Sequence, residues 1–280
     1  MSTKRQEEEI IEIIDGKKYL RLYYFMPADH FLDVLEKDEI KVSIPEECND
    51  PLEFLPAADK QNKEPKRLEG GFISFSRRYN SSLMWAHYAD SHKGVCLEFL
   101  FPIEKQGHLK AKRELEIEKS SRFIIFDVDE AERRQYTHID LEHCCAAAVE
   151  VAYGTHRPEH GLISSAVFGS EGLISFDVSA EFYTKSIEWN YEKEWRLLVC
   201  LSATKQYHDG AFFVTGLTKY LHGIIIGTKY NKSCGTTWSH IYQSLMRNPH
   251  FNDSSMIGKI KLSRAAYDDD TYTIKQTSDN

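Results

Sequence analysis

Hydrophobic and polar positions along this chain of 280 residues change period several times, and each change marks an expected element. Residues 72–76 (FISFS) and 95–99 (VCLEF) have the apolar, β-rich composition of strands. Between them, the apolar residues of the segment 83–88 recur at three and four residues, which is the helical period. The pattern therefore predicts a strand, a helix capped by Ser81 or Ser82, and a second strand.

A second block at 189–199 (WNYEKEWRLLV) places charged and aromatic residues directly before an apolar strand. We expect this block to face residues 72–99 across a cleft. The remaining segments predict further strands at 19–26, 40–43, 122–128, 211–216, 222–227 and 257–263. They also predict helices at 30–39, 131–153, 178–186 and 239–248, of which 131–153 has the best helical pattern.

These elements predict an α+β fold, with a split, mostly antiparallel sheet flanked by helices in a single domain. We place that domain at 19–263, after an arm at 1–18 that is rich in Lys, Glu and Ile. Residues 264–280 are expected to form a polar tail that frays from Asp268. Within the domain, the charged residues 57–69 predict a mobile helix or flap over the cleft, and residues 105–119 predict a solvated segment.

Composition and charge narrow the classes of partner. The net charge of −8 argues against broad, sequence-independent binding to nucleic acid, because such binding depends on Lys and Arg neutralising phosphates. The six cysteines show no CxxC spacing, which favours reduced thiols and a cytoplasmic protein. Neither a signal peptide nor an apolar run of about 18 residues is visible, so no membrane partner is expected.

The densest group of candidate functional residues lies in the second block. If residues 192–199 form one strand, Glu192 and Glu194 point the same way, while Trp195, Leu197 and Val199 point the other way into a core. One or both glutamates could then line a pocket with aromatic rings, beside Trp189 and Arg196. The alternative is that Glu194 pairs with an arginine and Glu192 is solvated.

The first block and an earlier turn supply further candidates for binding a ligand. Those of the first block are Ser74, Ser76, Trp85, His87 and Tyr88. The alternative is structural: His87 makes its hydrogen bonds on the helix without a functional role, and Trp85 and Tyr88 are aromatic residues of the core. The turn at 48–54 (CNDPLEF) contributes Asn49, Asp50 and Glu53, or else serves only as a proline-anchored turn in which Asn49 or Asp50 caps the next element.

Sequence signatures of metal and phosphate sites are weak or absent. His156 and His160 are four residues apart, but Pro158 and Gly161 break the helix that such a pair would need. Cys144 and Cys145 would point about 100° apart on a helix, so we expect no metal site. The sequence also lacks a phosphate-binding loop and the glycine-rich dinucleotide fingerprint.

Three blocks resemble a known bacterial family. NDPLEF at 49–54, MWAHYA at 84–89 and WNYEKEWR at 189–196 look like those of the bacterial domain-of-unknown-function family 2971. The resemblance extends over roughly residues 20–230. It implies a family membership without an established activity.

The order of elements is also similar to that of the ADP-ribosyltransferase fold. This resemblance implies a cleft that binds NAD, in which a glutamate at the start of a late strand holds the nicotinamide ribose and orients the acceptor. At matching positions it makes Glu192 or Glu194 the catalytic glutamate and puts Ser76 and Tyr88 near the NAD-contacting centre. The role of the first strand falls to three neighbouring residues, Arg21, Tyr23 and Tyr24.

We therefore expect NAD-dependent transfer of ADP-ribose to a protein or nucleic acid, in the manner of a toxin or phage-defence effector. A second hypothesis is a hydrolase or nuclease that uses Glu53, His87 and Glu194 as an acid-base set. A third is a non-catalytic binding or regulatory module. A homo-oligomer is compatible with each of them.

Overall fold

A computed structural model describes most of the two blocks and of the sheet around them. The described residues are 11–50, 52–54, 70–103, 124–125, 137–141, 145–158, 162–169, 172–208, 210–230, 237–251 and 254–278. The segments 57–69 and 105–119, expected as a flap and a solvated segment, lie outside these residues.

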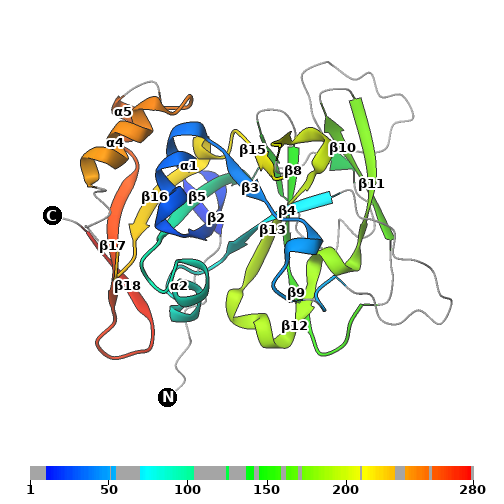
Figure 1. Ribbon diagram of the computed structural model, residues 1–280, viewed down its shortest axis with the longest axis horizontal. Coiled ribbons are helices and arrows are strands. Elements are labelled where there is room, and N and C mark those ends of the chain that lie inside the picture. Colours follow the sequence, from blue (N-terminus) through cyan, green and yellow to red (C-terminus); the bar gives the residue numbers. More distant parts are fainter. Residues whose placement is uncertain are drawn as a thin grey trace.

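Ten strands form the main sheet, and the pairing is antiparallel except between β16 and β17 (Figure 1). Its order is β18 (Ile274–Ser278), β17 (Lys261–Tyr267), β16 (Leu221–Ile226), β5 (Val95–Ile103), β2 (Lys17–Met26), β4 (Gly70–Ser76), β13 (Glu194–Cys200), β8 (Cys145–Glu150) and β7 (Thr137–Asp140), with β1 (Ile11–Ile14) paired to β2. With few helices around it, this mixed, mostly antiparallel sheet confirms the predicted α+β class.

The main sheet consists of two well-paired halves that meet at a narrow seam. β2 pairs with β5 along its length, from Lys18 to Met26, and β4 pairs with β13 over all seven of its residues. β2 and β4 are joined by one residue pair only, Tyr23 with Ser76. Because the two strands pair at one point and diverge elsewhere, side chains of both can line an opening between them.

Three smaller sheets and a few short helices complete the described chain. The sheets are formed by β11 (Gly172–Ser179), β10 (Leu162–Gly169) and β6 (Ile124–Ile125), by β12 (Thr184–Ser186) and β9 (Ala152–Gly154), and by β14 (Lys205–Gln206), β15 (Phe212–Val214) and β3 (Ile40–Val42). The α-helices are α1 (Phe31–Lys37), α2 (Ser82–Tyr88), α4 (Trp238–Arg247) and α5 (Ser254–Ile257). The 3₁₀ helices are η1 (Ala28–His30), η2 (Pro45–Glu47), η3 (Ala180–Tyr183), η4 (Ile187–Glu192), η5 (Leu201–Ala203) and η6 (Thr218–Tyr220).

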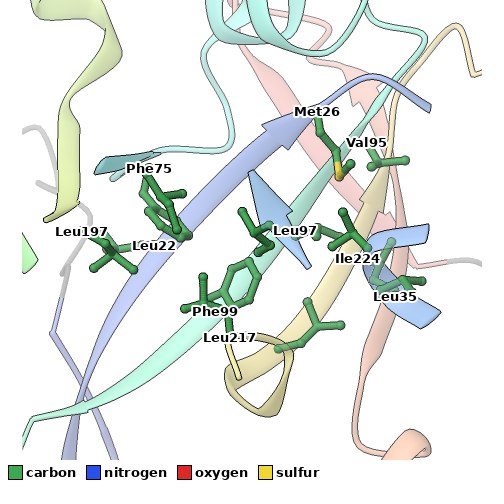
Figure 2. Close-up of a cluster of buried hydrophobic side chains, with 14 of the residues drawn as sticks. Leu22, Met26, Leu35, Phe75, Val95, Leu97, Phe99, Leu197, Leu217 and Ile224 are labelled. Atoms are coloured by element: carbon green, nitrogen blue, oxygen red, sulfur yellow. The ribbon is translucent and has the colours of Figure 1, made fainter. Parts of the chain in front are cut away.

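The main sheet has an apolar core on each of its faces. On one face, alternate residues of β2, β5 and β16 pack with β13 and with Leu35 of α1, as Figure 2 shows for Leu22, Leu97 and Ile224. On the other face, α2 covers a smaller cluster in which Trp85 meets Phe25 edge to face. The alternation of side chains along a strand therefore buries both faces.

The strand, helix and strand predicted over residues 72–99 are confirmed as β4, α2 and β5, and Ser81 caps α2 by accepting from the backbone N–H of Met84. The predicted helix over 131–153 is wrong, because the described part of this segment forms β7, β8 and the start of β9. β8 lies between β7 and β13 in the sheet. Residues 145–149 (CAAAV) are a continuous apolar run, and such a run cannot be distinguished from a buried helix by periodicity alone.

Both predicted ends of the domain also need correction. Residues 11–14 are not part of a separate arm, since β1 pairs with β2. The expected fraying tail instead continues β17 and forms β18, and Ile274 is buried in the cluster beneath α2. A single buried isoleucine and backbone pairing thus order a segment whose polar composition predicted a loose end.

Smaller differences concern the later helices. The helix expected at 178–186 is replaced by the end of β11, η3 and β12. The helix expected at 239–248 begins at Trp238, and Thr237 is its N-cap. Across the described residues, no helix has the length and apolar character needed to cross a membrane.

Candidate functional site

A cleft of about 230 Å³ opens where the two halves of the sheet meet. We call it the seam cleft. Its lining comes from β2, β3, β4, α2, the segment around η2, and the β12–η4–β13 segment. The lining residues are Tyr23, Tyr24, Phe25, Lys41, Ser43, Glu47, Cys48, Asn49, Asp50, Glu53, Phe72, Ile73, Ser74, Phe75, Ser76, Met84, Tyr88, Lys185, Trp189, Glu192, Glu194 and Arg196. Residues of both sequence blocks thus line one cleft, although their strands β4 and β13 are paired neighbours in the sheet and do not lie on opposite sides of it.

Glu192 and Glu194 reach this cleft by a route that the sequence did not predict. Glu192 ends η4 and Glu194 begins β13, so the two do not share one strand. Lys193 between them adopts a left-handed conformation, with φ of 46°, which turns the chain from the helix into the strand. Both carboxylates nevertheless converge on Lys185, whose Nζ lies 2.7 Å from Glu192 and 3.3 Å from Glu194.

Arg196 is the buried centre of the cluster, and its side chain has no exposed surface. Its Nε donates to Glu194 at 2.8 Å, its other nitrogens donate to Glu53 and to the carbonyl of Phe182, and its guanidinium lies 4.6 Å from the ring centre of Phe72. The alternative prediction that Glu194 pairs with an arginine is therefore confirmed, whereas Glu192 is buried rather than solvated.

The surroundings of Glu194 keep its carboxylate ionised. Burial raises the pKa of Glu194, but Arg196, Lys185 and the hydroxyl of Ser74 outweigh it and hold the pKa at about 2. The Ser74 hydroxyl donates to Glu194 at 2.6 Å. With Arg196 donating to both of its oxygens, Glu194 is a fixed negative charge with fully occupied acceptors.

Glu192 has a different electrostatic balance. The Tyr88 hydroxyl donates to one of its oxygens and Lys185 to the other. Burial raises the pKa of Glu192 and Glu194 raises it further, while Lys185 and the Tyr88 hydroxyl lower it, so that it remains above its ordinary value. A carboxyl group that exchanges a proton more readily than its neighbour can act as a general base or acid.

Lys185 is the functional candidate that the sequence predictions missed. It lies on β12, its side chain is 8% exposed, and its Nζ is 5.0 Å from the ring centre of Trp189. Burial lowers the pKa of Lys185, but Glu194, Glu53 and Glu192 raise it more strongly, so the ammonium is charged. The sequence could have indicated this residue only by its position, four residues before Trp189, the first tryptophan of the WNYEKEWR block.

The early turn is tied to the same cleft. Asp50 accepts from the indole N–H of Trp189 at 3.0 Å and from the backbone N–H of Leu52 at 2.9 Å. Asn49 and Glu53 both line the cleft. Ser76 lines it too, although its hydroxyl donates to the backbone carbonyl of Glu192 at 2.6 Å and therefore fixes the turn before β13. The early turn at 48–54 thus both anchors Trp189 through Asp50 and forms a wall of the cleft.

Three predicted residues do not line the seam cleft: Arg21, Trp85 and His87. Arg21 pairs with Glu98 and Glu12 further along the sheet. Trp85 is buried and donates its indole N–H to the carbonyl of Tyr79 at 2.6 Å. The helical period of α2 directs Met84 and Tyr88 to the cleft and leaves His87 exposed.

Sequence analysis also missed the wall that the segment between β3 and the turn supplies. The residues concerned are Lys41 of β3, Ser43, Glu47 and Cys48, the first residue of the turn at 48–54. The acid-base set proposed for a hydrolase is brought together only in part, because Glu53 and Glu194 meet at Arg196 without His87. Within the described ranges, no three His, Cys, Asp or Glu side chains are grouped so that they could hold a metal ion.

Comparison with known families gives one match. Residues 84–197 match the model of a family described as protein of unknown function (DUF2971). This matched segment is similar to that family and covers less than half of the chain. It contains the MWAHYA and WNYEKEWR blocks, with Tyr88, Glu192 and Glu194, and it also contains Lys185. β2 and the NDPLEF turn lie before it.

The DUF2971 match therefore includes the carboxylates of the second block and leaves out one wall of the cleft. No curated protein and no solved structure matches the chain. The resemblance to the ADP-ribosyltransferase fold consequently stays a prediction.

Proposed function

We propose that the seam cleft is the active site of an enzyme that breaks the bond between nicotinamide and ribose in NAD and transfers ADP-ribose to a protein or nucleic acid. The observation that supports this most directly is the buried carboxyl of Glu192 in an aromatic-walled cleft. It is accompanied by Lys185 and by the fixed charge of Glu194.

The charge and the walls of the cleft suit the nicotinamide half of NAD. The nicotinamide ring of NAD is a planar cation, and aromatic faces and carboxylates both attract planar cations. Tyr23, Tyr88 and Trp189 contribute aromatic side chains to the lining. A cleft of about 230 Å³ is smaller than the usual range of about 300–1,000 Å³ for ligand pockets, so it suits the ring and its ribose, with the rest of NAD outside.

The reaction assigns one role to each glutamate. As the bond between ribose C1′ and the ring nitrogen breaks, its electron pair stays with nicotinamide and positive charge develops on the ribose. The Glu192 carboxylate stabilises that charge and then accepts the proton of the acceptor oxygen or nitrogen that attacks C1′. Glu194, saturated by Arg196 and Ser74, positions Lys185 and does not take up a proton.

The test is NAD consumption by the purified protein, with nicotinamide release and mass analysis of added proteins and nucleic acids for ADP-ribose. Glu192→Gln should lower the rate by about 10²–10³-fold, because it removes the charge that stabilises the transition state. Glu188→Gln is the matched control, since Glu188 is exposed on the same 3₁₀ helix and does not line the cleft. Equal rates in the two variants, or no NAD consumption by the folded protein, would reject the proposal.

A binding or regulatory module is the second candidate, favoured by the saturated hydrogen bonds of Arg196 and Glu194. In that case, substitutions in the cleft lower stability in proportion to the burial of the side chain, and no turnover is lost. Measuring unfolding alongside NAD consumption for each variant separates the two candidates.

A further inference from the structure

The buried cluster contains one more negative side chain than positive ones. Glu53, Glu192 and Glu194 surround Lys185 and Arg196, and each of the five side chains is at most 8% exposed. An uncompensated charge in such a place is costly, so it must be neutralised by a proton or by a ligand.

The unneutralised charge belongs to Glu192. Glu194 accepts from Arg196, Lys185 and Ser74, and Glu53 is paired with both Arg196 and Lys185. Glu192 shares Lys185 with the other two carboxylates, and its other hydrogen-bond donor is the neutral hydroxyl of Tyr88. It is therefore the carboxyl with the least positive charge beside it.

We propose that the seam cleft binds a planar aromatic monocation and that this cation replaces a proton held by Glu192. The choice of a nicotinamide-type cation rests on the proposed function. The exchange itself rests on the charge balance, because a proton neutralises the cluster when the cleft is empty and the ligand neutralises it when the cleft is filled. No net charge is then buried in either state.

Among the titratable groups of the cluster, Glu192 is the one that exchanges the proton. The groups that face it are Lys185 from β12, Tyr88 from α2, Glu194 from β13, Tyr191 from η4 and Tyr153 from β9. Arg196 from β13 and Glu53 from the turn at 52–54 are connected to Glu192 through Glu194 and Lys185. Burial raises the pKa of Tyr88 and of Tyr153, which stay protonated, and the carboxylates keep Lys185 charged. Glu194 stays ionised because Arg196 holds its pKa at about 2 against the effect of burial.

The experiment compares two probes of nearly the same shape. 1-Methylnicotinamide is a monocation, and nicotinamide is its neutral counterpart. Calorimetric titration in two buffers of different ionisation enthalpy measures both affinity and proton release, from about pH 5 to about pH 8. We expect the affinity for the cation to rise about tenfold per pH unit below the pKa of Glu192 and to level off above it, with about one proton released per cation bound on the acid side. Nicotinamide should bind more weakly and without pH dependence.

Variants assign the proton to Glu192. Glu192→Gln carries no titratable group, so its affinity for 1-methylnicotinamide should be lower and independent of pH. Glu188→Gln should match the wild type. If Glu192→Gln does not fold, Tyr88→Phe serves instead, because removal of a hydrogen bond that lowers the pKa of Glu192 should move the wild-type pH profile to higher pH.

The outcomes also separate this inference from the proposed function. Three results would overturn the exchange of proton and cation. They are an affinity for 1-methylnicotinamide that does not change with pH, equally strong binding of nicotinamide, and no binding of either probe. NAD consumption without proton-coupled binding would keep the proposed function and reject the inference. Proton-coupled binding of 1-methylnicotinamide without NAD consumption would do the reverse.

Discussion

Replacing Arg196 by Met tests how strongly the cluster depends on its buried cation. The substitution keeps an apolar stem of similar length next to Phe72 but removes the charge and every hydrogen bond to Glu194, Glu53 and the carbonyl of Phe182. Removing one partner of a buried ion pair usually costs about 3–5 kcal/mol, because the other charge stays buried without compensation. We expect a loss in that range in the free energy of unfolding.

The pKa of Glu194 gives a second route to the same magnitude. Burial raises this pKa, but Arg196 and Lys185 bring it to about 2 in the folded protein, against an ordinary value of 4.5. That difference corresponds to about 3 kcal/mol of stability. Since the folded pKa is the lower one, the contribution is complete above about pH 4.5 and is lost as the pH falls towards about 2. In Arg196→Met most of this acid-sensitive contribution should be absent.

Denaturant unfolding at neutral and acid pH measures both effects. Arg77→Met is the matched control, because Arg77 pairs at 3.2 Å with Glu150 at the surface, where the exposed fractions are 31% and 54%. Such an exposed pair is worth at most about 1 kcal/mol. If Arg196→Met costs no more than this control, or keeps the wild-type loss of stability between about pH 4.5 and pH 2, the electrostatic account of the cluster is wrong.

Two further predictions concern the frame around the cleft. Gly94→Ala should lower the free energy of unfolding by about 1–3 kcal/mol, because the added Cβ would overlap the carbonyl oxygen of Met26. Thermal unfolding measures this loss. Asp38→Asn should cost about 1–3 kcal/mol in denaturant unfolding, because the buried carboxylate accepts from the backbone N–H groups of Gly216 and Thr218.

Each of these predictions has a control in the same chain. At Gly154 the nearest atom to an added Cβ lies at 3.6 Å, so Gly154→Ala should leave stability nearly unchanged. Asp33 is 63% exposed and pairs with Lys37 at 3.4 Å, so Asp33→Asn should cost less than about 1 kcal/mol. A result in which either test variant equals its control would contradict the packing or hydrogen-bond argument for that position.

Local patterns carried much of the prediction of strands. Apolar runs bounded by Gly, Pro and polar residues located β2, β4, β5 and β16, since these signals lie within a few residues of one another. They failed for β8, because a short continuous apolar run is compatible with a buried strand and with a buried helix. They also failed for β18, whose order depends on pairing with β17 and on the burial of Ile274.

The candidate site divides in the same way. Twelve of the fifteen residues predicted for it from the sequence line the seam cleft; Arg21, Trp85 and His87 do not. Side-chain chemistry and block spacing are local properties, and they were sufficient to select Glu192, Glu194 and Tyr88. Packing decides which face of the short helix α2 meets the cleft. His87 lies on another face and is therefore not part of the site.

The sequence alone determined the α+β class, the two blocks and the carboxylates that meet between them. Only the tertiary structure decided that Lys185 stands among three glutamates, that Arg196 saturates Glu194, and that Glu192 is left with the smallest compensating charge. The physical reason is that charge compensation in a buried cluster depends on distances between residues that are far apart in the chain, such as Glu53 and Arg196. No local pattern of residues records those distances.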